Sequence, residues 1–195
     1  MKLLPQPYVL PFDELPGAIS KRALTEHYKL YTGYRETLKR VDAKLKTAGQ
    51  PTKPLSESEY ANLLRVQSQA LAGAYLHELF FQNLTDSTVH IMILLGVHKL
   101  MEIGWGTQEA FRKAFRAAAM NAKGWAILGL AEDNKPRILT LDSHEMMPAG
   151  VTPLFVLDTY EHAYWMDHGA DRAAYLDALA HYHNWFAADT RLKAI

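Results

Sequence analysis

The sequence predicts an α+β protein with a long antiparallel helical hairpin followed by a small three-stranded antiparallel sheet with flanking helices. Two long N-terminal segments place apolar residues at steps of three and four, as one face of a helix does. After Gly124 the pattern changes to short apolar runs typical of strands, and helical spacing returns near the C-terminus. We expect a helical hairpin domain at residues 1–84 and an α/β domain at residues 85–195.

The first long helix is expected to begin after Ser20, a suitable N-cap, and to run to about Lys46. Its apolar face also carries a histidine, His27. A histidine on such a face is more often a core residue than a ligand, so this position alone does not decide between the two. The expected buried stripe consists of Leu24, His27, Tyr28, Tyr31, Tyr34, Leu38, Val41 and Leu45.

A second long helix is expected after the loop at residues 48–54. Ser56 and Glu59 have the spacing of a capping box that would open it. Its inner face includes His77. Because a short loop joins the two helices, they should pack as an antiparallel hairpin, in which His27 and His77 can meet at the same depth.

The remaining elements are expected in the second half of the chain. Thr107 is a candidate N-cap there, and the polar segment at residues 132–136 is a candidate hairpin turn. We expect helices at 89–103, 108–121 and 173–186, and strands at 125–130, 137–141 and 153–157.

Composition excludes several classes of protein. The 195 residues are 49% hydrophobic and carry 21 basic and 21 acidic side chains, so no overall charge attracts nucleic acid or an anionic membrane. Cysteine is absent, which excludes disulfides and thiolate ligands and fits a reducing compartment. No apolar run approaches the length of a membrane span, and we expect a cytoplasmic protein.

Chemically active side chains concentrate where the last expected strand ends. Asp158 follows this apolar run, and Glu161 and His162 come shortly after it. A carboxylate and an imidazole together suit iron, manganese or zinc, although two ligands seldom hold a metal and others must come from elsewhere. The alternative is an ordinary strand-to-helix junction with Asp158 as its N-cap.

Several fragments resemble one family in the same order. The fragment Asp158-Thr-Tyr-Glu161-His162-Ala-Tyr resembles the Asp-x-Trp-Glu-His-Ala-Tyr signature of iron/manganese superoxide dismutases. The fragment His77-Glu-Leu-Phe-Phe-Gln-Asn-Leu resembles their His-x-x-x-Trp-x-Asn-Leu helix segment. Residues 15–28, Gly124-Trp125-Ala126 and Arg172-Ala-Ala-Tyr175 also resemble the family's pattern, so the resemblance covers nearly the whole chain.

The resemblance implies four metal ligands, His27, His77, Asp158 and His162, which hold one iron or manganese ion per subunit. It also implies an enzyme that disproportionates the superoxide anion to oxygen and hydrogen peroxide. A non-catalytic relative that keeps the fold, and serves as a metal-binding or structural protein, is the alternative. A zinc hydrolase is disfavoured because the sequence has no His-Glu-x-x-His motif.

Departures from the family pattern lie around the expected metal. The family's tyrosine two turns beyond the first histidine ligand matches Tyr34 or Arg35, depending on how the shorter helix is aligned, and we favour Tyr34. The family's gateway histidine is replaced by Leu30 or Tyr31, and Trp165 replaces the tyrosine that is its partner across the subunit interface.

The family's outer-sphere glutamine is also missing. One of its two positions is Gly73 here, and the other falls within residues 142–145, which contain no glutamine. His144 or Glu145 is expected to take its place near the metal-bound solvent. A changed side chain there would alter the protonation of that solvent and the potential of the metal.

Glu161 is expected to act at a subunit interface. In the family, the matching glutamate crosses a two-fold interface to a histidine ligand of the other subunit, so the resemblance implies a homodimer through Glu161 and His162. The alternative is that Glu161 only caps or solvates its own helix.

Overall fold

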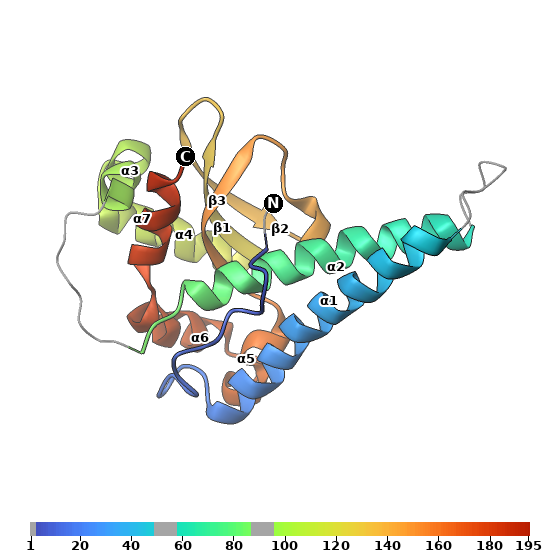
Figure 1. Ribbon diagram of the computed structural model, residues 1–195. Helices are drawn as coiled ribbons and strands as arrows, with labels where there is room; N and C mark the ends of the chain where they lie inside the picture. Colours follow the sequence, from blue (N-terminus) through green and yellow to red (C-terminus); the bar gives the residue numbers. More distant parts are fainter. Residues whose placement is uncertain (1–2, 49–57, 87–95) are drawn as a thin grey trace.

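The computed structural model describes residues 3–48, 58–86 and 96–195 and confirms the α+β arrangement (Figure 1). Helices α1 (Lys21–Thr47) and α2 (Glu59–Gln82) lie against each other as a long hairpin that projects from the rest of the molecule. The sheet and the remaining helices gather around the other end of this hairpin. Residues 49–54, in the expected loop, lie outside the described residues.

The N-terminal ends of both long helices are capped by serine side chains. Ser20 accepts a hydrogen bond from the Ala23 amide, as the sequence predicts for α1. The expected start of α2 was wrong: the helix begins at Glu59, and its cap is Ser58, which accepts from the Ala61 amide at 3.1 Å. Ser56, the expected cap, lies outside the described residues.

The three predicted strands form one antiparallel sheet in the order β2-β1-β3. They are β1 (Trp125–Ala131), β2 (Pro136–Leu141) and β3 (Val151–Asp158). In the central strand, Trp125 pairs with Leu141 on one side and with Asp158 on the other. This register places the indole of Trp125 beside the end of β3, where the candidate ligand Asp158 lies.

Helices cover the sheet and complete the core (Figure 1). Two of them precede the sheet, namely α3 (Gly96–Trp105) and α4 (Gln108–Asn121), and Thr107 caps α4 as predicted. The expected helix at 89–103 is therefore seen only from Gly96, because residues 89–95 lie outside the described part of the chain. None of the helices in the described residues is long and apolar enough to cross a membrane.

The expected closing helix at 173–186 is broken into separate pieces, so that prediction was wrong. The pieces are α6 (Arg172–Leu179), the short 3-10 helix η2 (Ala180–Tyr182) and α7 (Trp185–Lys193). His183 leaves the helical path to form a β-bridge with Leu84, and Asn184 then caps α7 by accepting from the Ala187 amide. The cap and the bridge together stop one helix from continuing into the next.

His183 provides a test of this packing through the pH dependence of stability. Its ring contacts those of Phe155 and Trp185, and burial lowers its pKa from 6.5 to about 3. The folded protein therefore binds fewer protons than the unfolded chain below pH 6.5, and His183 makes stability fall as the pH falls toward about 3.

We expect His183→Phe to remove this dependence while keeping the aromatic packing. Between about pH 6 and pH 4, the free energy of unfolding of the parent should fall by about 1.4 kcal/mol per pH unit more than that of the variant. Urea unfolding across this pH range measures both curves. Parallel curves would show that His183 does not carry the acid sensitivity.

Candidate metal centre

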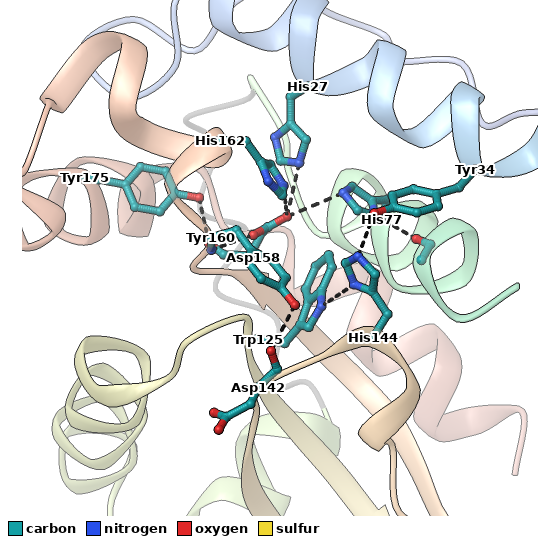
Figure 2. Close-up of polar contacts among 11 residues, drawn as sticks. His27, Tyr34, His77, Trp125, Asp142, His144, Asp158, Tyr160, His162 and Tyr175 are labelled. Carbon is teal, nitrogen blue, oxygen red and sulfur yellow. Dashed lines mark hydrogen bonds and ion pairs between the residues drawn. The ribbon is translucent and has the colours of Figure 1, made fainter. Parts of the chain in front are cut away.

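The structure brings together four potential ligands from four different elements. His27 lies on α1, His77 on α2, Asp158 at the end of β3, and His162 in the first turn of α5 (Glu161–His168) (Figure 2). One ligand atom from each lies within 4.8 Å of all the others. His27, His77 and Asp158 are buried, whereas 30% of the His162 side chain is exposed.

The distances among these atoms fit a shared metal ion. Asp158 Oδ2 is 3.1 Å from His27 Nε2, 3.2 Å from His162 Nε2 and 3.7 Å from His77 Nε2. Ligand atoms that each lie about 2 Å from one metal ion are separated by about 3 Å or slightly more. Three imidazoles and one carboxylate are also donors that iron and manganese accept.

His77 shows most directly that the cluster suits a metal. Its Nδ1 lies 2.6 Å from the carbonyl oxygen of Gly73 and donates a hydrogen bond to it, so the neutral ring has a lone pair on Nε2. This Nε2 is buried and has no hydrogen-bond partner. A buried, unpaired lone pair that faces a carboxylate is expected where a cation completes the site.

Electrostatics keep the buried ligands in the protonation states that a metal requires. Burial alone would raise the pKa of Asp158, but the imidazoles of His162 and His27 lower it well below its usual range. Burial lowers the pKa of His77 to about 3, and it also lowers that of His27 despite the nearby carboxylate. The site therefore offers a charged carboxylate and two neutral buried imidazoles.

Asp158 is oriented by groups that do not belong to the ligand set. Its Oδ1 accepts a hydrogen bond from the Tyr160 amide at 2.9 Å, and its main-chain oxygen accepts from the buried Tyr175 hydroxyl at 3.0 Å. The N-cap position of α5 belongs to Tyr160, not to Asp158. The alternative that Asp158 merely caps this helix is therefore wrong.

A second layer of hydrogen bonds runs from Tyr34 through His144 to Trp125 (Figure 2). Tyr34 Oη lies 2.8 Å from His144 Nε2, and Trp125 Nε1 donates to His144 Nδ1 at 2.9 Å. Because an indole N–H can only donate, Nδ1 must accept, and neutral His144 carries its proton on Nε2. Burial lowers the pKa of His144, which favours this neutral form. His144 therefore donates to Tyr34, which leaves the tyrosine hydroxyl proton free to point elsewhere.

Helix geometry explains why Tyr34, and not Arg35, faces the cluster. Tyr34 follows His27 by seven residues, which is almost two turns, so both lie on one face of α1. The Tyr34 ring contacts the His77 ring, with 5.4 Å between centroids. Arg35 is rotated a further 100° and instead donates to Glu78 at 2.7 Å.

His144 and Glu145, the two residues expected to replace the family's glutamine, differ in position. His144 is buried at the start of the 3-10 helix η1 (His144–Met146), and its ring lies 5.6 Å from that of His77. Glu145 is exposed, and in the described part of the chain it makes no hydrogen bond to the cluster. Geometry therefore distinguishes two residues that are adjacent in the sequence.

Sequence reasoning missed two contributors to the site, Trp125 and Tyr175. Both lie in the fragments that resemble the family, but their local sequence indicates only buried core positions. Their importance depends on sheet register and helix placement, which bring the indole to His144 and the phenol to Asp158. Phe81 and Tyr160 complete the surroundings, with ring centroids 5.1 Å from His27 and 5.2 Å from His162.

Comparison with known proteins supports the resemblance to iron/manganese superoxide dismutases. A family profile described as iron/manganese superoxide dismutases, C-terminal domain, matches residues 96–191. Among similar proteins, a superoxide dismutase (Fe) of Aquifex pyrophilus is 32% identical over 98% of this chain and 92% of its own length. A superoxide dismutase (Fe) of Cupriavidus metallidurans is 31% identical over 90% of this chain and 89% of its own.

Relatives named for manganese match as well. A mitochondrial superoxide dismutase (Mn) of Penicillium chrysogenum is 26% identical over 98% of this chain and 93% of its own length. Both metals thus occur in the names of proteins that align with nearly all of these residues. From the extent of these matches and the His/Asp cluster, the chain belongs to the iron/manganese superoxide dismutase family.

Proposed function

We propose that this protein is a superoxide dismutase that holds one iron or manganese ion per subunit and converts superoxide to oxygen and hydrogen peroxide. The observation that carries the proposal is the cluster of His27, His77, Asp158 and His162, with the unpaired His77 Nε2 aimed into it. The names and coverage of the relatives support the same activity. The missing glutamine favours the non-catalytic alternative, but His144 supplies a polar group in that region.

The four ligands and the second layer have different parts in the proposed reaction. A bound iron or manganese ion supplies one-electron chemistry in both directions, so that one superoxide is oxidised and the next is reduced. Reduction of superoxide to hydrogen peroxide consumes two protons, which the protein must help to deliver. Tyr34 is suited to this task because His144 already donates to its oxygen, so the hydroxyl proton of Tyr34 remains free for donation toward the cluster of four ligands.

The proposed ligand set is tested by removing each ligand in turn. We expect His27→Ala, His77→Ala, Asp158→Ala and His162→Ala to lose stoichiometric metal and superoxide disproportionation together, since each removes one of four converging donors. Metal is measured by mass spectrometry of the purified variants, and activity by the decay of superoxide. His181→Ala, at an exposed histidine outside the cluster, is the control and should retain both. A ligand variant with parental metal content would remove that residue from the set.

The second layer is tested by comparing two adjacent residues. His144→Ala should keep the metal but lower turnover by about ten- to a hundred-fold, because Tyr34 loses the donor that orients its hydroxyl. His144→Gln should recover part of this loss, since its amide can donate to Tyr34. Glu145→Ala is the matched control and should behave as the parent. Equal losses in His144→Ala and Glu145→Ala would mean that neither orients Tyr34 in the way proposed.

We also propose a homodimer that forms over the surface around the first turn of α5. Glu161 is exposed there beside the partly exposed ring of His162. Apolar side chains accompany them on α5 and α1, where 54% of Trp165 and 41% of Leu30 are exposed. A two-fold contact on this surface would let each Glu161 accept a hydrogen bond from the partner's His162 and thereby orient a metal ligand.

Glu161→Ala tests the bridge between the proposed dimer and the metal. We expect weaker association and lower metal occupancy in the same sample, because the imidazole of His162 loses its acceptor. Sedimentation velocity and metal analysis of one preparation measure both effects. Glu109→Ala, at an exposed residue on α4 that forms an ion pair with Lys113, is the control. A Glu161→Ala protein that remains fully dimeric and fully metallated would show that the bridge is absent.

A further inference from the structure

The N-terminal arm, residues 3–10, is attached to the helical hairpin through its main chain. This segment, dark blue in Figure 1, runs past α2 and α1 before the chain enters α1. At Leu4, the amide donates to Glu78 Oε1 at 2.9 Å, and the carbonyl oxygen accepts from Arg35 Nη2 at 2.8 Å. At Tyr8, the amide donates to Tyr31 Oη at 2.9 Å, and the carbonyl oxygen accepts from the Tyr28 hydroxyl at 2.8 Å.

Glu78 is the centre of this network. Glu78 is only 2% exposed, and the hydrogen bonds that the described residues donate to its carboxylate come from the N-terminal arm and from two successive turns of α1. Oε2 accepts from the Tyr31 hydroxyl at 2.6 Å and from Arg35 Nη1 at 2.7 Å, while Oε1 accepts from the Leu4 amide. A buried carboxylate with an arginine partner and additional donors is held in a defined position, and the loss of one member leaves the others unsatisfied.

The network lies directly beside residues of the metal centre. Tyr31 and Arg35 occur one turn apart on α1, and Tyr34 lies between them in the sequence. Glu78 follows the candidate ligand His77 on α2. One carboxylate therefore fixes the turn of α1 that carries Tyr34 against the turn of α2 that carries His77.

Close packing leaves Tyr34 little freedom once this turn is fixed. A Cβ atom at Gly73 would lie 2.9 Å from Cδ1 of the Tyr34 ring, so the ring rests directly on the α2 backbone. The same ring also contacts those of His77 and His144. A small rotation or shift of α1 would therefore change the 2.8 Å contact between Tyr34 Oη and His144 Nε2.

We propose that Glu78 is a positioning residue for Tyr34. Together with Tyr31, Arg35 and the backbone of the N-terminal arm, it sets the rotation of α1 at which the Tyr34 hydroxyl meets His144. The proposal deepens the function proposed above, since it takes Tyr34 as a participant in the superoxide reaction. Glu78 itself does not touch the metal ligands' donor atoms and acts only through Tyr34.

A double-mutant cycle tests this inference on the metal-loaded, full-length protein. Glu78→Gln alone should leave the metal content unchanged and lower kcat on the order of ten- to a hundred-fold, with a smaller effect on KM, because the reacting hydroxyl is displaced. In a Tyr34→Phe background, the same substitution should lower kcat by less than about two-fold, since the group it positions is gone. If Glu78→Gln does not fold, Tyr31→Phe removes one bond to the carboxylate, retains the ring, and should show the same dependence on Tyr34.

Arg191→Met is the matched control for general loosening of α2. Arg191 donates to Asn83 Oδ1 and to the Leu154 carbonyl oxygen, and so ties the C-terminal end of α2 to β3 and not to α1. This variant should be less stable but should retain the parental kcat. Equal falls of kcat for Glu78→Gln in both backgrounds, or a fall of the same size in Arg191→Met, would overturn the proposal.

Azide affinity provides a readout that does not depend on superoxide turnover. Azide is a small anion that binds open metal positions, and its dissociation constant is measured from the metal's absorbance. Glu78→Gln should change this constant several-fold when Tyr34 is present and should leave it unchanged in Tyr34→Phe. If Glu78→Gln changes the azide dissociation constant equally with and without Tyr34, the positioning role is overturned, even in a protein without dismutase activity. If the change depends on Tyr34, the positioning role is supported, and the dismutase proposal can still fail on its own test.

Discussion

The buried carboxylate of Asp158 is the constraint on which the rest of the structure depends. A charge removed from water is costly unless opposite charge or hydrogen bonds surround it, and Asp158 has no exposed surface. Imidazoles on α1, α2 and α5 lie around its Oδ2. The Tyr160 amide donates to its Oδ1, and the Tyr175 hydroxyl donates to its main-chain oxygen. The hairpin, the last strand and the helix after it must therefore all be in place for the site to exist. Metal binding at this cluster would be coupled to folding for the same reason, since a cation would stabilise only the assembled cluster.

We propose that His144 takes the place of the family's missing glutamine in the second layer. A glutamine at Gly73 would crowd the Tyr34 ring in this arrangement, because its Cβ would lie 2.9 Å from Cδ1 of that ring. His144 reaches the same tyrosine from η1, and Trp125 determines which of its nitrogens carries the proton. The His144 imidazole thus links Trp125 to Tyr34: its Nδ1 accepts from the indole, and its Nε2 donates to the tyrosine hydroxyl. The proposed positioning role of Glu78 concerns the placement of Tyr34 relative to this donor.

Much of the fold was predictable from the sequence because it depends on local patterns. The spacing of apolar residues indicated α1 and α2, and the change in period after Gly124 indicated the sheet. The four candidate ligands were predicted from the family resemblance, and the structure brings them together. Features that depend on packing were not predictable in this way. The break before α7 needs the bridge from His183 to Leu84, and the roles of Glu78 and Trp125 need contacts between segments distant in the sequence.

X-ray absorption at the metal edge of the purified, metal-loaded protein tests the central claim most directly, because it reports the atoms bound to the ion. We expect a mononuclear site with three imidazole nitrogens and one carboxylate oxygen from the protein at about 2.0–2.2 Å, with any further ligand supplied by solvent. Spectra of His77→Ala or Asp158→Ala should lose this pattern. A parent spectrum with fewer than three imidazoles, or one that either substitution leaves unchanged, would contradict the assignment of the Asp158 cluster as the metal centre.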